Sequence, residues 1–103
     1  MLTSKQRAYL RGLANTKPTI ILLGKASLTD ENLQNVEEAL AARELIKIGV
    51  LKNCDDSPRE IAEAVAEHTY ADVVQVIGKK IVLYRPGRGD KKKIVLPKDN
   101  KKQ

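Results

Sequence analysis

The chain has 103 residues and a mass of 11.4 kDa, which suits one domain and leaves no room for two. Its residues are 42% hydrophobic and 31% charged, and the net charge is +6. No apolar run approaches the roughly 20 residues of a transmembrane helix, and the polar N-terminus predicts no secretory signal. With one cysteine, Cys54, and one histidine, His68, we expect no disulfide, metal or cofactor, and a cytoplasmic location.

The N-terminal half predicts two helices and two strands. A capping-box pair opens a helix over residues 4–15, whose apolar side chains recur at helical spacing. The apolar run 19–23 predicts a strand buried on both faces, which ends at Gly24. Thr29 caps a second helix, and the alternating residues 45–51 that follow it predict a second strand.

The C-terminal half predicts a third helix and a hairpin. A serine cap, a proline at the first helical position and a nearby glutamate predict a helix over 58–69. Residues 73–77 and 81–84 are expected to pair as a hairpin through a tight turn. Beyond residue 85 the composition predicts a basic, flexible tail, 86–103, in which residues 94–96 could add to a sheet edge.

The predicted order of elements is therefore αβαβαββ. Strand–helix–strand units favour parallel pairing, and the final hairpin adds an antiparallel partner. We expect an α/β, two-layer domain over residues 1–85 with a mixed four-stranded sheet. At least the second and third helices should pack on one face of that sheet.

The positive charge lies at the two ends of the chain. Residues 1–25 carry five basic side chains and no acidic one, and residues 73–103 carry ten basic and two acidic ones. Residues 26–72 carry eleven acidic and four basic side chains. The pattern indicates either a polyanionic partner that touches both ends, or a basic surface that serves only solubility.

The residues that could support catalysis do not converge. Cys54 precedes the third helix and His68 lies near its end, so roughly 15–20 Å separates them. No phosphate-binding or dinucleotide-binding fingerprint is present. The sequence therefore predicts no enzyme and no small-molecule substrate, with a small enzyme that uses Cys54 as a minor alternative.

The loop Gly24-Lys25-Ala26-Ser27 joins a strand to the start of a helix. Such a junction presents backbone N–H groups to an anion, and Lys25 and Ser27 add a positive charge and a hydroxyl donor. A glycine-bordered clamp of four residues grips the sugar–phosphate backbone in KH-type RNA modules. Alternatively, Gly24 only terminates the strand.

Several stretches of the chain together resemble a known family. They are LTSKQR at 2–7, YLR at 9–11, LGK at 23–25, LT at 28–29, ARELIK at 42–47, VQVIGK at 74–79 and IVLYR at 81–85. In content and order they resemble the CRM domain, the chloroplast RNA splicing and ribosome maturation module, and especially the small bacterial proteins of the YhbY type.

The resemblance implies a fold related to the C-terminal domain of translation initiation factor three. It also implies RNA binding and, for bacterial members, association with precursors of the large ribosomal subunit. The family's loop after the first strand is Gly-x-x-Gly. Gly24 matches its first glycine, and Ser27 stands at the second.

We therefore expect a monomeric, non-catalytic RNA-binding domain that acts in ribosome assembly. Because Phe and Trp are absent, structured ribosomal RNA read by shape suits the chain better than base stacking does; Tyr9 and Tyr84 are the candidate stackers, with Tyr84 expected in the core. A protein-interaction module that docks a basic protein on its acidic middle is the alternative. The predicted RNA-binding residues are Lys5, Arg7, Arg11, Lys17, Gly24, Lys25, Ser27, Lys79, Lys80, Arg85 and Arg88.

Overall fold

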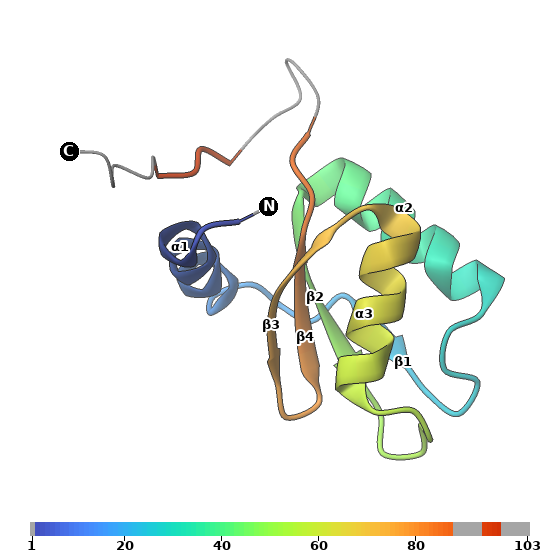
Figure 1. The fold of residues 1–103 in the computed structure, drawn as a ribbon. Helices are drawn as coiled ribbons and strands as arrows, with labels where there is room; N and C mark the ends of the chain where they lie inside the picture. The colour runs from blue at the N-terminus through green and yellow to red at the C-terminus, as the bar shows by residue number, and fades with distance from the viewer. Residues whose placement is uncertain (1, 88–93, 98–103) are drawn as a thin grey trace.

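The computed structural model describes residues 2–87 and 94–97, and its elements follow the predicted order (Figure 1). No helix in these ranges has the length and hydropathy that a bilayer span requires. The elements are α1 (Ser4–Ala14), β1 (Ile21–Leu23), α2 (Asp30–Arg43), β2 (Leu45–Val50), α3 (Pro58–Thr69), β3 (Asp72–Ile77) and β4 (Lys80–Tyr84).

The strands form a mixed four-stranded sheet in the order β1-β2-β4-β3. β1 pairs with β2 in parallel, whereas β4 is antiparallel to both β2 and β3. The predicted fold class, the mixed sheet and the C-terminal hairpin are confirmed. The order places β1 and β3 at the two edges, with β4 inserted between β2 and β3.

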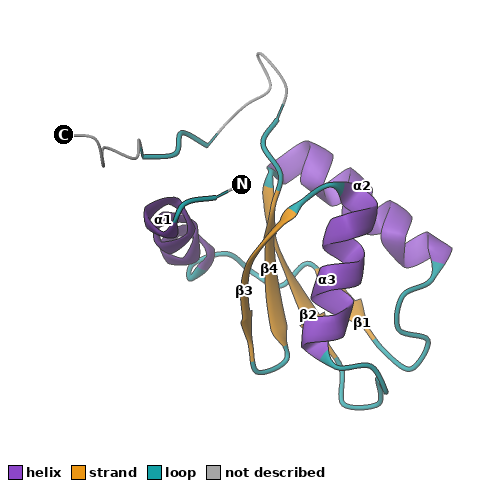
Figure 2. Cartoon of the chain, in the orientation of Figure 1, coloured by secondary structure: helices purple, strands orange, loops and turns teal. Residues whose placement is uncertain are grey.

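Helices cover both faces of this sheet (Figure 2). α2 and α3 pack on one face, where the β2 side chains of Ile46 and Ile48 join the main core. α1 packs on the other face with Leu45 and Tyr84, in a second core. The expectation that α2 and α3 share one face is confirmed. The two-layer description needs a correction, because α1 adds a third layer on the opposite face.

The helix starts follow the local sequence signals. The Thr3 hydroxyl accepts from the Gln6 N–H, and the Gln6 side chain accepts from the Thr3 N–H, which completes a capping box for α1. Ser57 and Glu60 form the same arrangement at α3. The Thr29 hydroxyl caps α2. The predicted caps are thus confirmed at all three helices of the described chain.

The prediction that the first strand is buried on both faces is wrong. β1 covers only Ile21–Leu23, and its central residue Leu22 is 59% exposed. Leu23 points into the main core, so Leu22 points to the α1 face. α1 contacts β2, β3 and β4 and lies over the Leu45 end of β2, which leaves Leu22 uncovered.

The segment Ile94–Pro97 packs beside α1 and forms no strand, so the expected addition to a sheet edge is not seen. Ile94 and Leu96 pack against the α1 core, and the Gln6 side chain donates to the Pro97 carbonyl over 3.2 Å. The buried Glu44 carboxylate accepts from the N–H groups of Gly87 and Ile94 over 2.7 and 2.8 Å. Residues 88–93 and 98–103 of the predicted tail lie outside the described residues.

Candidate nucleic-acid interface

Three connections meet at one end of the sheet. The Leu51 N–H donates to the Leu23 carbonyl, and the Val50 N–H donates to the Lys79 carbonyl, both over 2.8 Å. The loop after β1, the loop after β2 and the β3–β4 turn therefore lie together, as Figure 1 also shows. This arrangement gathers the exposed side chains of Lys25, Lys52, Lys79 and Lys80 at one end of the molecule.

The loop after β1 closes as a tight turn. The Ser27 N–H donates to the Gly24 carbonyl over 2.8 Å, and Ser27 has a φ of 55°. Glycine reaches this left-handed region without strain, whereas a residue with a Cβ does not. The Asn32 side-chain amide donates to the Ser27 carbonyl over 2.8 Å. Ser27 thus holds a left-handed backbone conformation of the kind that favours glycine.

The Ser27 hydroxyl does not fill the role of an exposed donor. Ser27 is 9% exposed, and its Oγ has no hydrogen-bond partner among the described residues. Lys25 is exposed at the tip of the turn. In the first turn of α2, Asp30 and Glu31 oppose an anion at the helix end. A phosphate is therefore better placed on the loop than on the α2 N-terminus.

The arginines of α1 line one flank of its buried stripe. Leu10 and Ala14 form that stripe, and Arg7 and Arg11, four residues apart, share one flank. Gln6 lies on the other flank, where the C-terminal segment packs. α1 contacts β2, β4 and β3, so it runs across the strands. Because the C-terminal segment is tied to the Leu45 end of β2 through Glu44, the arginine flank faces the opposite, loop-bearing end of the sheet.

Lys47 belongs to the same surface, although it was not among the predicted site residues. It alternates with the buried Ile46 and Ile48 and therefore points to the α1 face of β2, where it is half-buried. Its position inside the acidic segment of the sequence concealed it. The signal that could have found it was the strand alternation itself. Lys52, in the loop after β2, was missed for the same reason.

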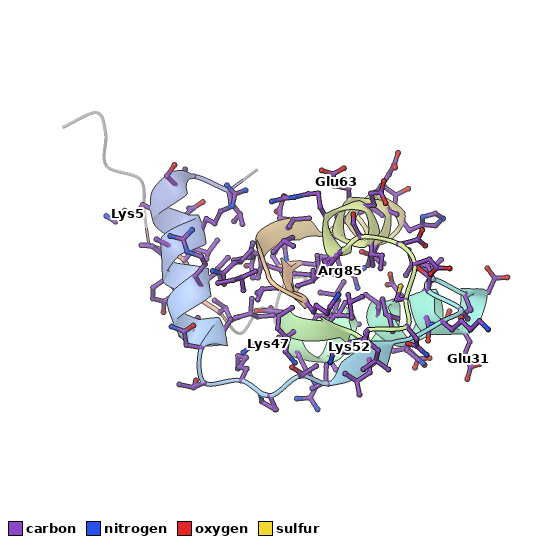
Figure 3. All side chains as sticks on the ribbon, turned by 90° about the horizontal axis from the view of Figure 1, so that it is seen from below. Lys5, Glu31, Lys47, Lys52, Glu63 and Arg85 are labelled. Atoms are coloured by element: carbon purple, nitrogen blue, oxygen red, sulfur yellow. The ribbon has the colours of Figure 1, made fainter. Side chains whose placement is uncertain are left out.

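The two signs of charge separate across the sheet. Figure 3 shows Lys5 beside α1, with Glu31 and Glu63 on the side of α2 and α3. Lys5 lies on the outer side of α1, and Lys17 is exposed in the connection to β1. We call the surface of α1, the α1 face of the sheet and the lysines of the three connections the basic face; the loop after β2 also carries the exposed Asp55 and Asp56. The acidic side chains of the helices on the other side are Asp30, Glu31, Glu37, Glu38, Glu60, Glu63 and Glu67.

Arg85 lies away from the basic face and is engaged within the protein. Its guanidinium donates to the Glu37 carboxylate over 2.8 Å and to the Thr69 carbonyl over 2.9 Å. These bonds tie the end of β4 to both α2 and α3. The role of Arg85 in RNA binding stays a prediction that this geometry does not favour. Arg88 lies outside the described residues.

The tyrosines differ sharply in exposure. Tyr84 is 1% exposed and belongs to the α1 core, which confirms that it is a core residue and leaves its ring unavailable for stacking. Burial raises the pKa of the Tyr84 phenol above its ordinary value, and the carboxylates of Glu44 and Asp72 raise this pKa further. Tyr9 on α1 is 43% exposed.

The reactive side chains of the described region remain apart. The Cys54 thiol is free and lies against the Asp56 carbonyl before α3. His68 faces solvent in the last turn of α3, where a ring nitrogen lies 3.3 Å from the Ala64 carbonyl. Within the described residues no cluster of three or more His, Cys, Asp or Glu side chains is arranged to hold a metal ion.

Comparison with known proteins assigns the fold and its motifs to a family. The CRS1/YhbY (CRM) domain model matches residues 2–85 of this chain. The chain belongs to the CRM domain family. The predicted resemblance is therefore confirmed, and the match extends from the residue before the Thr3 cap to Arg85, the residue after β4.

Relatives of this chain match it over nearly its whole length. The Bacillus subtilis "Probable RNA-binding protein YqeI" is 41% identical over 94% of this chain and all of its own length. A Haemophilus influenzae protein named "RNA-binding protein" is 38% identical, with 94% and 96% covered. The solution structure of SAV1595 from Staphylococcus aureus superposes with a TM-score of 0.79 at 42% identity, covering 94% of this chain and all of that one.

Proposed function

We propose that this chain is a non-catalytic RNA-binding domain. The single observation that carries the proposal is the basic face, where cations from α1, β2 and three connections gather on one side of the sheet. Family membership and the names of the relatives support the same partner. A polyanion gains from such a surface because each neutralised phosphate releases counterions.

The mechanism follows from which groups face the RNA. The turn at Gly24–Ser27 exposes Lys25 at its tip, where the ammonium group can meet a phosphate. Arg7 and Arg11 offer guanidinium groups to a second stretch of phosphates. The acidic face of α2 and α3 repels RNA, so the domain meets its partner in one orientation.

Charge reversal on the two faces tests this proposal. Lys25→Glu and Arg11→Glu should each weaken binding to a ribosomal RNA fragment at least several-fold, measured by fluorescence anisotropy at fixed salt. Arg43→Glu is the matched control, because it changes the net charge equally but lies in the last turn of α2. Equal loss in all three variants would show that only net charge matters and would overturn the assignment.

A result in which the acidic face matters for function and the basic face does not would favour a protein-docking role. Glu63→Lys alters an exposed side chain of the acidic face and should leave RNA affinity unchanged or slightly higher. If Glu63→Lys abolishes function in cells while Lys25→Glu does not, the acidic face binds a basic protein and RNA binding is not the main activity.

Within RNA binding, we propose ribosomal RNA of large-subunit precursors as the target, bound by a monomer in the cytoplasm. The support is the ribosome-maturation role that the family resemblance implies. Cross-linking to RNA in cells, followed by sequencing, should enrich ribosomal RNA, and the protein should co-sediment with precursor particles of the large subunit. Reads spread evenly over messenger RNA would contradict this target.

A further inference from the structure

Four residues form one row across the sheet on its α1 face. The registers pair Leu22 with Gly49, Gly49 with Lys80, and Lys80 with Ile77, so the row runs through β1, β2, β4 and β3. Paired residues point to the same face. With strands about 4.8 Å apart, the row is about 14 Å long. Leu22 and Ile77 at its two ends are 59% and 60% exposed.

The centre of the row is shaped by a glycine and a lysine. A Cβ on Gly49 would lie 2.9 Å from a Leu22 methyl group and 3.5 Å from the Lys80 ammonium nitrogen. Both side chains therefore lie over the bare backbone of Gly49. The Lys80 ammonium also donates to the Thr19 hydroxyl over 3.2 Å. The result is a low platform with apolar ends and a cation across its middle.

The platform continues into the candidate RNA-binding loop. Leu51, two residues after Gly49 and 42% exposed, lies with a methyl group 3.5 Å from the position of a Cβ on Gly24. On its other side the row faces the arginine flank of α1. Among the described residues no carboxylate forms an ion pair with Lys47 or Lys80, so their charges are available to an anionic partner.

We propose that this row, defined as Leu22, Gly49, Lys80 and Ile77, receives an unpaired stretch of RNA. This inference rests on the proposed RNA binding and specifies its substrate class. Leu22 and Ile77 pack against exposed base faces, while Lys80 and Lys47 meet the phosphates that flank them.

The side chains of the row match an unpaired RNA strand better than an RNA duplex. A duplex stacks its base faces inside, so it offers Leu22 and Ile77 no base face to pack on. An unpaired strand presents base faces and phosphates together, which matches aliphatic ends and a central cation. A platform of this kind adds a local contact with unpaired nucleotides to the shape-based recognition of structured RNA.

The test compares one RNA sequence in two states. A labelled oligoribonucleotide of about 12 nucleotides and mixed sequence is titrated with the protein by fluorescence anisotropy, alone and annealed to its complement. Leu22→Ser and Ile77→Ser should each weaken single-strand binding about five- to tenfold and change duplex binding less than twofold. Val95→Ser is the matched control, since Val95 is 80% exposed but lies in the C-terminal segment.

The possible results separate failure of the platform from failure of RNA binding as such. Equal weakening for both RNA states, or no effect of either serine variant, overturns the platform while leaving RNA binding intact. A wild-type dimer that Leu22→Ser converts to monomer in analytical ultracentrifugation also overturns it, because the row would then be a contact between copies. Failure of the wild type to bind either RNA at low salt would instead refute the proposed function. Thermal unfolding of the serine variants checks that the fold is kept.

Discussion

Ser27 shows how a single residue can hold a backbone shape that glycine adopts without strain. Its φ of 55° costs about 1 kcal/mol relative to glycine, and its buried hydroxyl has no partner in the described part of the chain. Ser27→Gly removes both the backbone strain and the buried hydroxyl that has no partner. Because Asn32 holds the Ser27 carbonyl, the turn itself should persist in that variant.

We therefore expect Ser27→Gly to raise the free energy of unfolding by about 1 kcal/mol, measured by urea denaturation, with RNA affinity retained. Ala26→Gly is the control one residue earlier, where φ is not positive. That control should lose about 0.5–1 kcal/mol through the greater freedom of the unfolded chain. Equal destabilisation by the two glycine substitutions would contradict the strain at Ser27.

Tyr84 is a second residue with a testable effect, in this case on how stability depends on pH. Its pKa in the folded protein is raised above 10.0 by burial and by the Glu44 and Asp72 carboxylates, so the folded state binds the phenolic proton more tightly than the unfolded state. The stabilisation linked to Tyr84 is therefore complete below pH 10 and is lost as pH rises through the folded-state pKa. Tyr84→Phe should not show this alkaline loss.

The measurement is the free energy of unfolding of both proteins between pH 8 and pH 11. At pH 8 the Phe variant should equal or slightly exceed the wild type, because the Tyr84 hydroxyl has no described partner to lose. Above pH 10 the advantage of the Phe variant should grow. Stability curves that stay parallel through this range would rule out the proposed linkage.

At the scale of elements, Arg85 is the tie between the sheet and two helices. Its bonds to Glu37 and to the Thr69 carbonyl join α2, α3 and β4 at the end of the molecule opposite the RNA-binding loops. We expect Arg85→Gln to lower the free energy of unfolding by about 1–2 kcal/mol. The affinity of the folded variant for RNA should change less than in Lys79→Gln, which removes the same charge from the basic face.

The two variants are compared by urea denaturation and by RNA titration at one salt concentration. Lys79 is exposed in the β3–β4 turn, so its variant should keep wild-type stability while losing affinity. An Arg85→Gln variant with full stability and strongly reduced RNA affinity would restore Arg85 to the interface and refute the structural role.

At the scale of the whole molecule, local signals predicted the elements and non-local contacts decided the surface. The capping boxes at Thr3 and Ser57 depend only on residues close together in the sequence, and so does the side-chain alternation of β2. They could therefore be predicted. The exposure of Leu22 could not, because it follows from a strand order that puts β1 at an edge. The partners of Arg85 lie at residues 37 and 69, which no local pattern connects to it.

The charge pattern shows the same division between local and non-local information. Counting along the chain gave basic ends around an acidic middle, and the fold converts this into a basic face and an acidic face. Lys47 reaches the basic face through the side-chain alternation of β2, and Lys52 reaches it because the loop after β2 lies at the end of the sheet where the three connections meet. The candidate loop and the β3–β4 turn were predicted separately, and the sheet brings them together at one end.

The salt dependence of RNA binding tests the central claim most directly. Binding of a ribosomal RNA fragment is measured from low to physiological salt, and the logarithm of the association constant is plotted against the logarithm of salt concentration. If the basic face neutralises about five phosphates, the slope should be about −3.5 to −4.5, and Lys25→Glu should make it shallower while Arg43→Glu leaves it unchanged. A flat slope for the wild type would contradict the account.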